Sequence, residues 1–254
     1  MNHKIKLTLF SLSFLLFSVK SNAQPIIEIG STPPSIGNEF QIMSGMLNST
    51  GESGENVIWD FSNLAVWDAG TQEIVAPAIY GWDNLLNECQ YAYISLIPDT
   101  LYSFFKLDST EFNAYLYRSP GYGEDNDYHL GPKKFLQFPF EYTDSYTVSY
   151  DQTGSNLSFT VHYDAYGTLI LPFGLVYENV VRIKETYSST FAYTWYTLDP
   201  LLEVARYSAT SEELRWLGPE SIPCNTCQGD FNNDGEINTS DLLQFLALFG
   251  SICG

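Results

Sequence analysis

The sequence predicts a mainly β protein, an antiparallel meander forming a sandwich, barrel or half-barrel, followed by a small C-terminal loop-helix module. Short segments rich in aromatic and β-branched residues recur between residues 24 and 218, separated by turn-forming residues. No segment in that range sustains the 3.6-residue period of an amphipathic helix. The composition then changes near Pro219 and Pro223. We therefore divide the chain into a β domain, 24–218, and a module, 219–254.

The expected strands are most regular in the second half of the β domain. Their close, even spacing favours antiparallel neighbours. In one of them, Val181 and Ile183 point to one face, whereas Arg182 and Lys184 point to the other, which the pattern predicts to be the outer face. The expected strands are 56–61, 91–97, 101–107, 156–163, 168–171, 176–186, 191–198, 201–208 and 212–216.

Residues 1–23 have the pattern of a secretory signal peptide. Lys4 and Lys6 precede an apolar run, and Ser21, Asn22 and Ala23 form a small-residue cleavage site. The apolar run is too short for a transmembrane helix, and no other stretch approaches the roughly 20 apolar residues that one requires. We therefore expect an exported protein, secreted or held at the cell surface, without a membrane span.

The charge of the chain excludes one class of partner. Asp and Glu number 30 against 11 Lys and Arg, and the formal net charge is −19. A protein this acidic repels phosphate backbones and anionic lipid surfaces. Nucleic acid is therefore not an expected partner.

Residues 230–241 have the residue types and spacing of a calcium-binding loop. Calcium prefers six to eight oxygen ligands, and loops of this kind supply them at positions 1, 3, 5, 7, 9 and 12. Gly235 at position 6 permits the sharp turn, and position 7 contributes its backbone carbonyl. The ligand positions are occupied by Asp230, Asn232, Asp234, Glu236, Asn238 and Asp241.

A helix is expected directly after this loop. Leu242, Phe245, Leu246 and Phe249 recur at helical spacing, and Gly250 follows them as a stop signal. The last loop ligand would then lie in the first turn of the helix, where a carboxylate suits the helix dipole.

The pattern Asp230-x-Asn232-x-Asp234-Gly235-x-Ile237-Asn238-x-x-Asp241-Leu242 resembles a dockerin type I repeat, a relative of the EF-hand. The resemblance covers residues 228–250 and implies Ca²⁺ as the bound ion. In that family two repeats pair and dock onto cohesin modules, usually to tether polysaccharide-degrading enzymes, whereas this chain has one repeat. The segment also resembles short Cys-flanked endings of secreted bacterial β-rich proteins.

Four cysteines in an exported chain predict two disulfides: Cys89, Cys224, Cys227 and Cys253. A bond between Cys227 and Cys253 would join the two ends of the module. A bond between Cys224 and Cys253 is the alternative, and the remaining cysteine could then pair with Cys89. The sequence leaves the connectivity open.

The β domain shows no sequence signature of a nucleophilic, zinc-dependent or nucleotide-binding enzyme, whereas hydrolysis of glycosides by a pair of carboxylates stays open in a chain with 30 acidic residues. It lacks the Gly-x-Ser-x-Gly, His-Glu-x-x-His and phosphate-binding glycine patterns. The aromatic content of the whole chain, 16%, favours either a large core or exposed rings that bind carbohydrate or a partner protein. The tryptophans considered for such a surface are Trp59, Trp67, Trp82, Trp195 and Trp216.

Our leading hypothesis is a secreted calcium-binding protein whose β domain has a non-catalytic binding or structural role. The alternative is an accessory component of extracellular polysaccharide degradation, with the dockerin-like module docking to a cohesin-like protein.

Overall fold

The computed structural model describes residues 24–28, 31–77, 89–97, 99–118, 133–152, 155–220 and residue 239. Its strands are β1 (Glu39–Met46), β2 (Gly54–Asp60), β3 (Val66–Val75), β4 (Tyr91–Ile97), β5 (Asp99–Leu107), β6 (Glu111–Arg118), β7 (Lys133–Gln137), β8 (Ser145–Gln152), β9 (Ser155–Leu171), β10 (Leu175–Thr186), β11 (Phe191–Leu198), β12 (Leu201–Ser208) and β13 (Glu213–Glu220). One 3₁₀ turn, η3 (Pro172–Gly174), joins β9 to β10.

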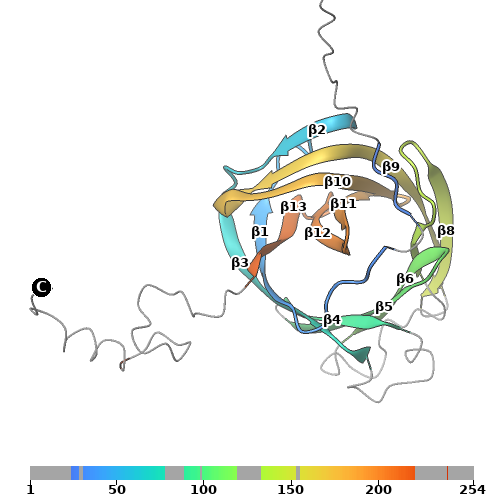
Figure 1. Cartoon of the computed structure of the whole chain (residues 1–254), viewed down its shortest axis with the longest axis horizontal. Coiled ribbons are helices and arrows are strands. Elements are labelled where there is room, and N and C mark those ends of the chain that lie inside the picture. Colours follow the sequence, from blue (N-terminus) through green and yellow to red (C-terminus); the bar gives the residue numbers. More distant parts are fainter. Residues whose placement is uncertain are drawn as a thin grey trace, which may run out of the picture.

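All of these strands belong to one sheet that curls into a ring (Figure 1). The order along the sheet is β2-β9-β10-β11-β12-β13-β1-β3-β4-β5-β6-β7, and β8 also pairs with β9. The ring closes where β8 lies beside β7, and there the Tyr146 hydroxyl donates a hydrogen bond to the Phe135 carbonyl over 2.7 Å. The mainly β prediction is therefore confirmed, in the form of a curled single sheet.

The sheet departs from a simple meander at two strands. β1 lies between β13 and β3, so the first and last strands of the domain are neighbours. β2 pairs in parallel with the second half of β9, opposite Ala165 to Ile170. The parallel pair is unusually close, because a Cβ atom added at Gly167 would lie 1.9 Å from the carbonyl oxygen of Val57. A glycine is therefore required at this crossing.

The N-terminal residues 24–28 and 31–38 contact strands and turns on several sides of the ring. Ile27 forms a two-way backbone bridge with Phe140. The Thr32 carbonyl accepts from the Leu201 amide, and Gly37 donates to the Ile74 carbonyl. Because these partners are on different sides of the ring, the segment holds one end of the ring together.

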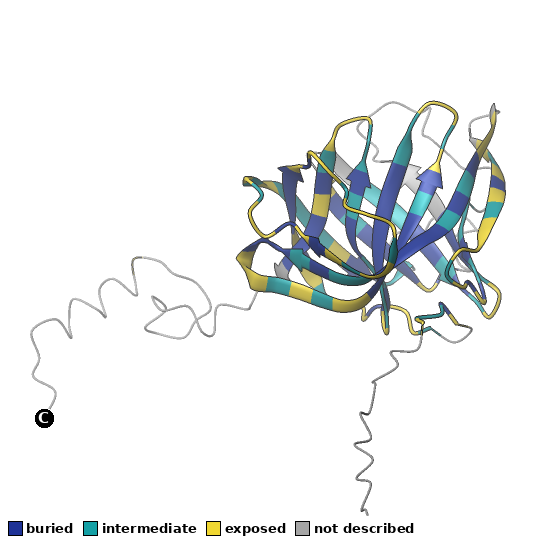
Figure 2. Cartoon of the chain, turned by 90° about the horizontal axis from the view of Figure 1, so that it is seen from above, coloured by how far each residue is buried: buried dark blue, intermediate teal, exposed yellow. Residues whose placement is uncertain are grey.

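Apolar side chains form one core inside the ring and another on its outer face. The inner core joins β4–β7 to β9–β13 and includes Phe105, Leu136 and Val181. The outer core lies between β2 and the outward faces of β9–β13 and β1, with Trp59 and Trp195 at its centre. Figure 2 shows how buried positions follow the strands. The protein therefore buries both faces of one part of its sheet, which suits near-continuous apolar strands.

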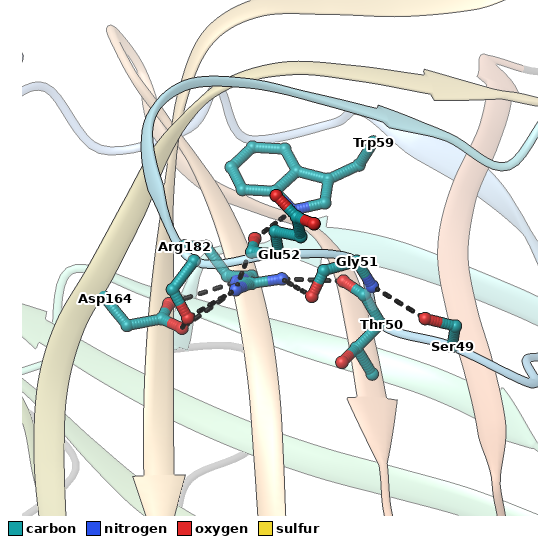
Figure 3. Close-up of polar contacts among 8 residues, drawn as sticks. Ser49, Thr50, Gly51, Glu52, Trp59, Asp164 and Arg182 are labelled. Carbon is teal, nitrogen blue, oxygen red and sulfur yellow. Dashed lines mark hydrogen bonds and ion pairs between the residues drawn. The ribbon is translucent and has the colours of Figure 1, made fainter.

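Arg182 lies in the outer core, and this corrects the expectation of a solvent-facing position. Its side chain is fully buried, because the loop 49–53 covers it. The guanidinium donates to both carboxylate oxygens of Asp164, over 3.0 and 2.8 Å, and to the carbonyls of Thr50 and Glu52, over 2.6 and 2.9 Å (Figure 3).

Aromatic rings complete the surroundings of the buried guanidinium. Its central carbon lies 4.4 Å from the centre of the Tyr193 ring and 5.1 Å from that of Trp59. A buried cation is tolerated only when it is paired and hydrogen-bonded. Arg182 meets both conditions, and the aromatic rings around it add cation–π attraction. Arg182 therefore fastens the loop 49–53, and with it the start of β2, to the outside of the ring.

Among the described residues, no helix is long and apolar enough to cross a membrane.

Candidate functional site

A cavity of about 330 Å³ lies inside the ring. This volume is at the lower end of the range of roughly 300–1,000 Å³ that is typical of small-molecule sites. One wall comes from β4–β7 and carries the aromatic rings of Tyr93, Phe105 and Phe112 beside the polar side chains of Ser95, Ser103 and Lys133. The opposite wall comes from β11–β13 and carries the charged residues Glu203 and Arg206. A ligand here would contact aromatic rings on one side and polar groups on the other.

A buried charged cluster supports the polar wall. Glu185 is 2% exposed and accepts two parallel hydrogen bonds from Arg206, over 2.8 and 2.9 Å. Arg206 also donates to the Thr194 hydroxyl over 2.7 Å, and Tyr187 donates to Glu185. Bidentate guanidinium–carboxylate pairs of this kind are strong and directional. The pair therefore fixes the position of the Arg206 side chain beside the cavity.

Lys133 is the second cation near Glu185. Its ammonium lies 4.0 Å from the Glu185 carboxylate and within 4.7 Å of the centres of the Phe135 and Phe159 rings. Burial lowers the pKa of Lys133, although the charge of Glu185 opposes this shift. The aromatic rings and the carboxylate together stabilise the ammonium at the base of the cavity wall.

The pKa of Glu185 reflects its two cations. Burial alone would raise it, but attraction to Arg206 and Lys133 and the hydrogen bonds from Arg206 and Tyr187 outweigh burial and lower the pKa to about 2. Glu185 is therefore ionised throughout the neutral and mildly acidic range.

Glu203 differs from Glu185 in having no hydrogen-bond partner among the described residues, although it lines the cavity. Burial raises its pKa, and the nearby charge of Arg206 only partly offsets this effect. A carboxylate that is held inside a protein without a partner is costly, so it is a strong candidate to contact a ligand.

A third ion pair lies at the cavity wall on β13. Arg215 lines the cavity and donates to both carboxylate oxygens of Glu213, each over 3.0 Å. Glu213 also accepts a hydrogen bond from Ser44 on β1 over 2.6 Å. Both charges of this pair are thus already satisfied within the protein.

The calcium site predicted from the sequence lies outside the described residues. This applies to Asp230, Asn232, Asp234, Glu236, Asn238 and Asp241, to Cys224, Cys227 and Cys253, and to the signal segment 1–23. Thr239 alone is described there, as helical and exposed. In the described ranges no group of three or more His, Cys, Asp or Glu side chains is arranged to hold a metal ion.

Two other sets of predicted residues can be placed. Cys89 is buried beside Val75, Ala92 and Phe104. Trp59, Trp195 and Trp216 are buried in the outer core, so they are not an exposed binding surface. Trp67 is 43% exposed, and Trp82 lies outside the described residues.

The sequence did not indicate the polar wall, because an irregularity in β12 creates it. Glu203 and Arg206 are three positions apart, and a regular strand would place them on opposite faces. The register shifts, however, so that Tyr196 lies opposite Glu203 and Trp195 opposite Ala205, which leaves Val204 as an extra residue. This bulge brings both charged side chains to the cavity face.

No protein-family model matches the chain, and no match was found among curated proteins or solved structures.

Proposed function

We propose that the protein is an exported, non-catalytic binding protein that holds a small molecule inside its ring of strands and Ca²⁺ in its C-terminal module. The observation that carries the first part is the cavity, where the carboxylate of Glu203, which has no hydrogen-bond partner in the described part of the chain, faces aromatic rings. Sites for small molecules are commonly concave and mostly apolar, with few polar groups that fix orientation. The cavity has this composition.

The neutral fluorophore N-phenyl-1-naphthylamine tests whether the cavity accepts a ligand. We expect its fluorescence to rise saturably when the 24–254 protein is added. Ser103→Phe should abolish the rise, because Ser103 lines the cavity and a phenyl ring would fill part of it. Leu96→Phe is the matched control, because Leu96 is 48% exposed on β4. An absent signal, or an equal signal in all three proteins, would count against the cavity as the binding site.

The calcium part of the proposal rests on the spacing of residues 230–241. We expect one saturable site in a calorimetric titration of the 24–254 protein, with a Kd of roughly 10⁻⁴ to 10⁻³ M, as in extracellular calcium modules. The double variant Asp230→Ala, Asp234→Ala should lose this heat and any thermal stabilisation by calcium.

The control for the calcium experiment removes two other carboxylates. Glu39 and Asp151 are exposed acids of the β domain, so Glu39→Ala, Asp151→Ala changes the net charge equally. This control should bind calcium like the parent protein. An unchanged titration in the Asp230→Ala, Asp234→Ala variant would refute the loop assignment.

The alternative role, an accessory component of polysaccharide degradation, is favoured by the dockerin-like residues 228–250. It requires docking to a cohesin-like protein. Retention on an immobilised cohesin in the presence of calcium, followed by release with a chelator, would support this alternative role. Absence of retention would favour the binding protein proposed above.

A further inference from the structure

The polar groups on β12 that face the cavity form a donor and an acceptor side by side. Glu203 presents carboxylate oxygens without a hydrogen-bond partner in the described part of the chain. Arg206 is its neighbour on the same face because of the bulge at Val204. The Arg206 side chain is 31% exposed, so it remains open to the cavity.

Arg206 keeps part of its hydrogen-bonding capacity for a ligand. Its Nη1 donates to Glu185 and Thr194, and its Nη2 donates to Glu185. A guanidinium has five N–H donors in a planar fork. In the described residues no bond engages the Nε hydrogen, and Nη2 has a second hydrogen. The Nε edge of the fork can therefore donate to another oxygen.

The charges at the cavity favour a neutral ligand. The cations are Lys133, Arg206 and Arg215, and the carboxylates that line the cavity or bind these cations are Glu185, Glu203 and Glu213. Three positive and three negative groups balance. A charged ligand would leave one unmatched charge in a half-enclosed site, which is unfavourable.

The aromatic wall adds apolar ring surface opposite these polar groups, with the Phe105 and Phe112 planes nearly parallel and the Tyr93 plane tilted by 52° to that of Phe105. The Tyr93 and Phe105 ring centres are 4.6 Å apart, and those of Phe105 and Phe112 are 5.5 Å apart. The ligand that fits both walls is uncharged, offers donors and acceptors on adjacent atoms, and has an apolar face. A pyranose sugar has these properties, because its ring hydrogens form an apolar face and its neighbouring hydroxyls both donate and accept.

We propose that the cavity binds a neutral carbohydrate, with Glu203 accepting a hydrogen bond from one hydroxyl and Arg206 donating to the adjacent one. This inference rests on the proposed function, namely that the cavity holds a small molecule. It assigns Glu203 and Arg206 as the residues that recognise a vicinal diol, and Phe105 and its neighbours as the surface on which the sugar ring stacks.

Calorimetry with the methyl glycosides of glucose, galactose, mannose and xylose tests the inference on the 24–254 protein. We expect at least one of them to bind, and the variant Glu203→Leu to weaken that binding at least tenfold. The same variant should still bind N-phenyl-1-naphthylamine, because leucine fills a similar volume and leaves the cavity open. Circular dichroism of the variant checks that the fold is retained.

The outcomes separate this inference from the proposed function. If the fluorophore binds but no glycoside does, or if Glu203→Leu binds the glycoside as tightly as the parent, the carbohydrate assignment is overturned and the binding cavity stands. If neither the fluorophore nor any glycoside binds, the proposed function itself fails.

A series of sugars of different charge tests the preference for a neutral ligand. The neutral sugar that binds is compared with an amino sugar and a uronate of the same ring configuration, which differ from it in charge. We expect the neutral sugar to bind at least tenfold more tightly than the cationic and anionic sugars. Preferential binding of either charged sugar would overturn the neutral-ligand assignment.

Discussion

Replacing Arg182 with methionine is expected to destabilise the protein by about 4 kcal/mol, because it leaves a buried charge unpaired. Arg182 is fully buried, and its partner Asp164 is 4% exposed. Asp164 would keep only the hydrogen bond from Ser53, over 3.0 Å. The Thr50 carbonyl would also lose its donor, and the Glu52 carbonyl would keep only the hydrogen bond from the Trp59 indole, over 3.3 Å. Equilibrium urea unfolding followed by tryptophan fluorescence measures the change.

Two further variants test whether the loss comes from the unpaired carboxylate. Removing both charges with Arg182→Met, Asp164→Leu should recover much of the stability, since replacing a whole buried pair by apolar residues is often neutral. Arg215→Met is the matched control. Arg215 makes the same kind of ion pair with Glu213 but is 47% exposed, so its loss should cost at most about 1 kcal/mol. Equal losses at Arg182 and Arg215 would contradict the assigned role of Arg182.

Replacing Glu185 with glutamine is expected to cost about 3 kcal/mol at neutral pH. The pKa of Glu185 lies at about 2 instead of 4.5, and each unit corresponds to about 1.4 kcal/mol. A carboxyl with a lowered pKa in the folded state stabilises the protein above its unfolded pKa. That stability is lost as the pH falls through the folded value. The stability difference between parent and variant should therefore narrow between about pH 4.5 and pH 2.

Glu203→Gln is the matched control for this experiment, because it removes a second carboxylate near Arg206, and the pKa of that carboxylate is shifted in the opposite direction. Its folded pKa is raised, so ionisation of Glu203 destabilises the protein as the pH rises through that value. The variant should be at least as stable as the parent at neutral pH. Urea unfolding at several pH values measures both variants, and a loss at Glu203→Gln equal to that at Glu185→Gln would contradict the account of the charged cluster.

The strands could be predicted from local composition because they are rich in residue types that favour β structure. The segments 91–97, 191–198 and 201–208 coincide with β4, β11 and β12. The segments 156–163 and 168–171 were expected to be separate, but they form the continuous strand β9. Gly167 resembles a turn residue in the sequence, whereas in the structure it makes room for the close crossing of β2.

Long-range contacts explain what the sequence could not predict. Arg182 alternates with Val181 and Ile183 as an outward residue should, and it does point outward. It is buried because the loop 49–53, distant in the sequence, folds over it. The polar wall of the cavity likewise depends on one extra residue in β12, which no period-two pattern contains.

The most direct test of the binding cavity is a crystal structure of the 24–254 protein with a methyl glycoside that binds in calorimetry. We expect electron density for the sugar inside the ring, between Glu203 and Arg206 on one side and Phe105 on the other. Density for the sugar at another surface, with only water inside the ring, would contradict this expectation.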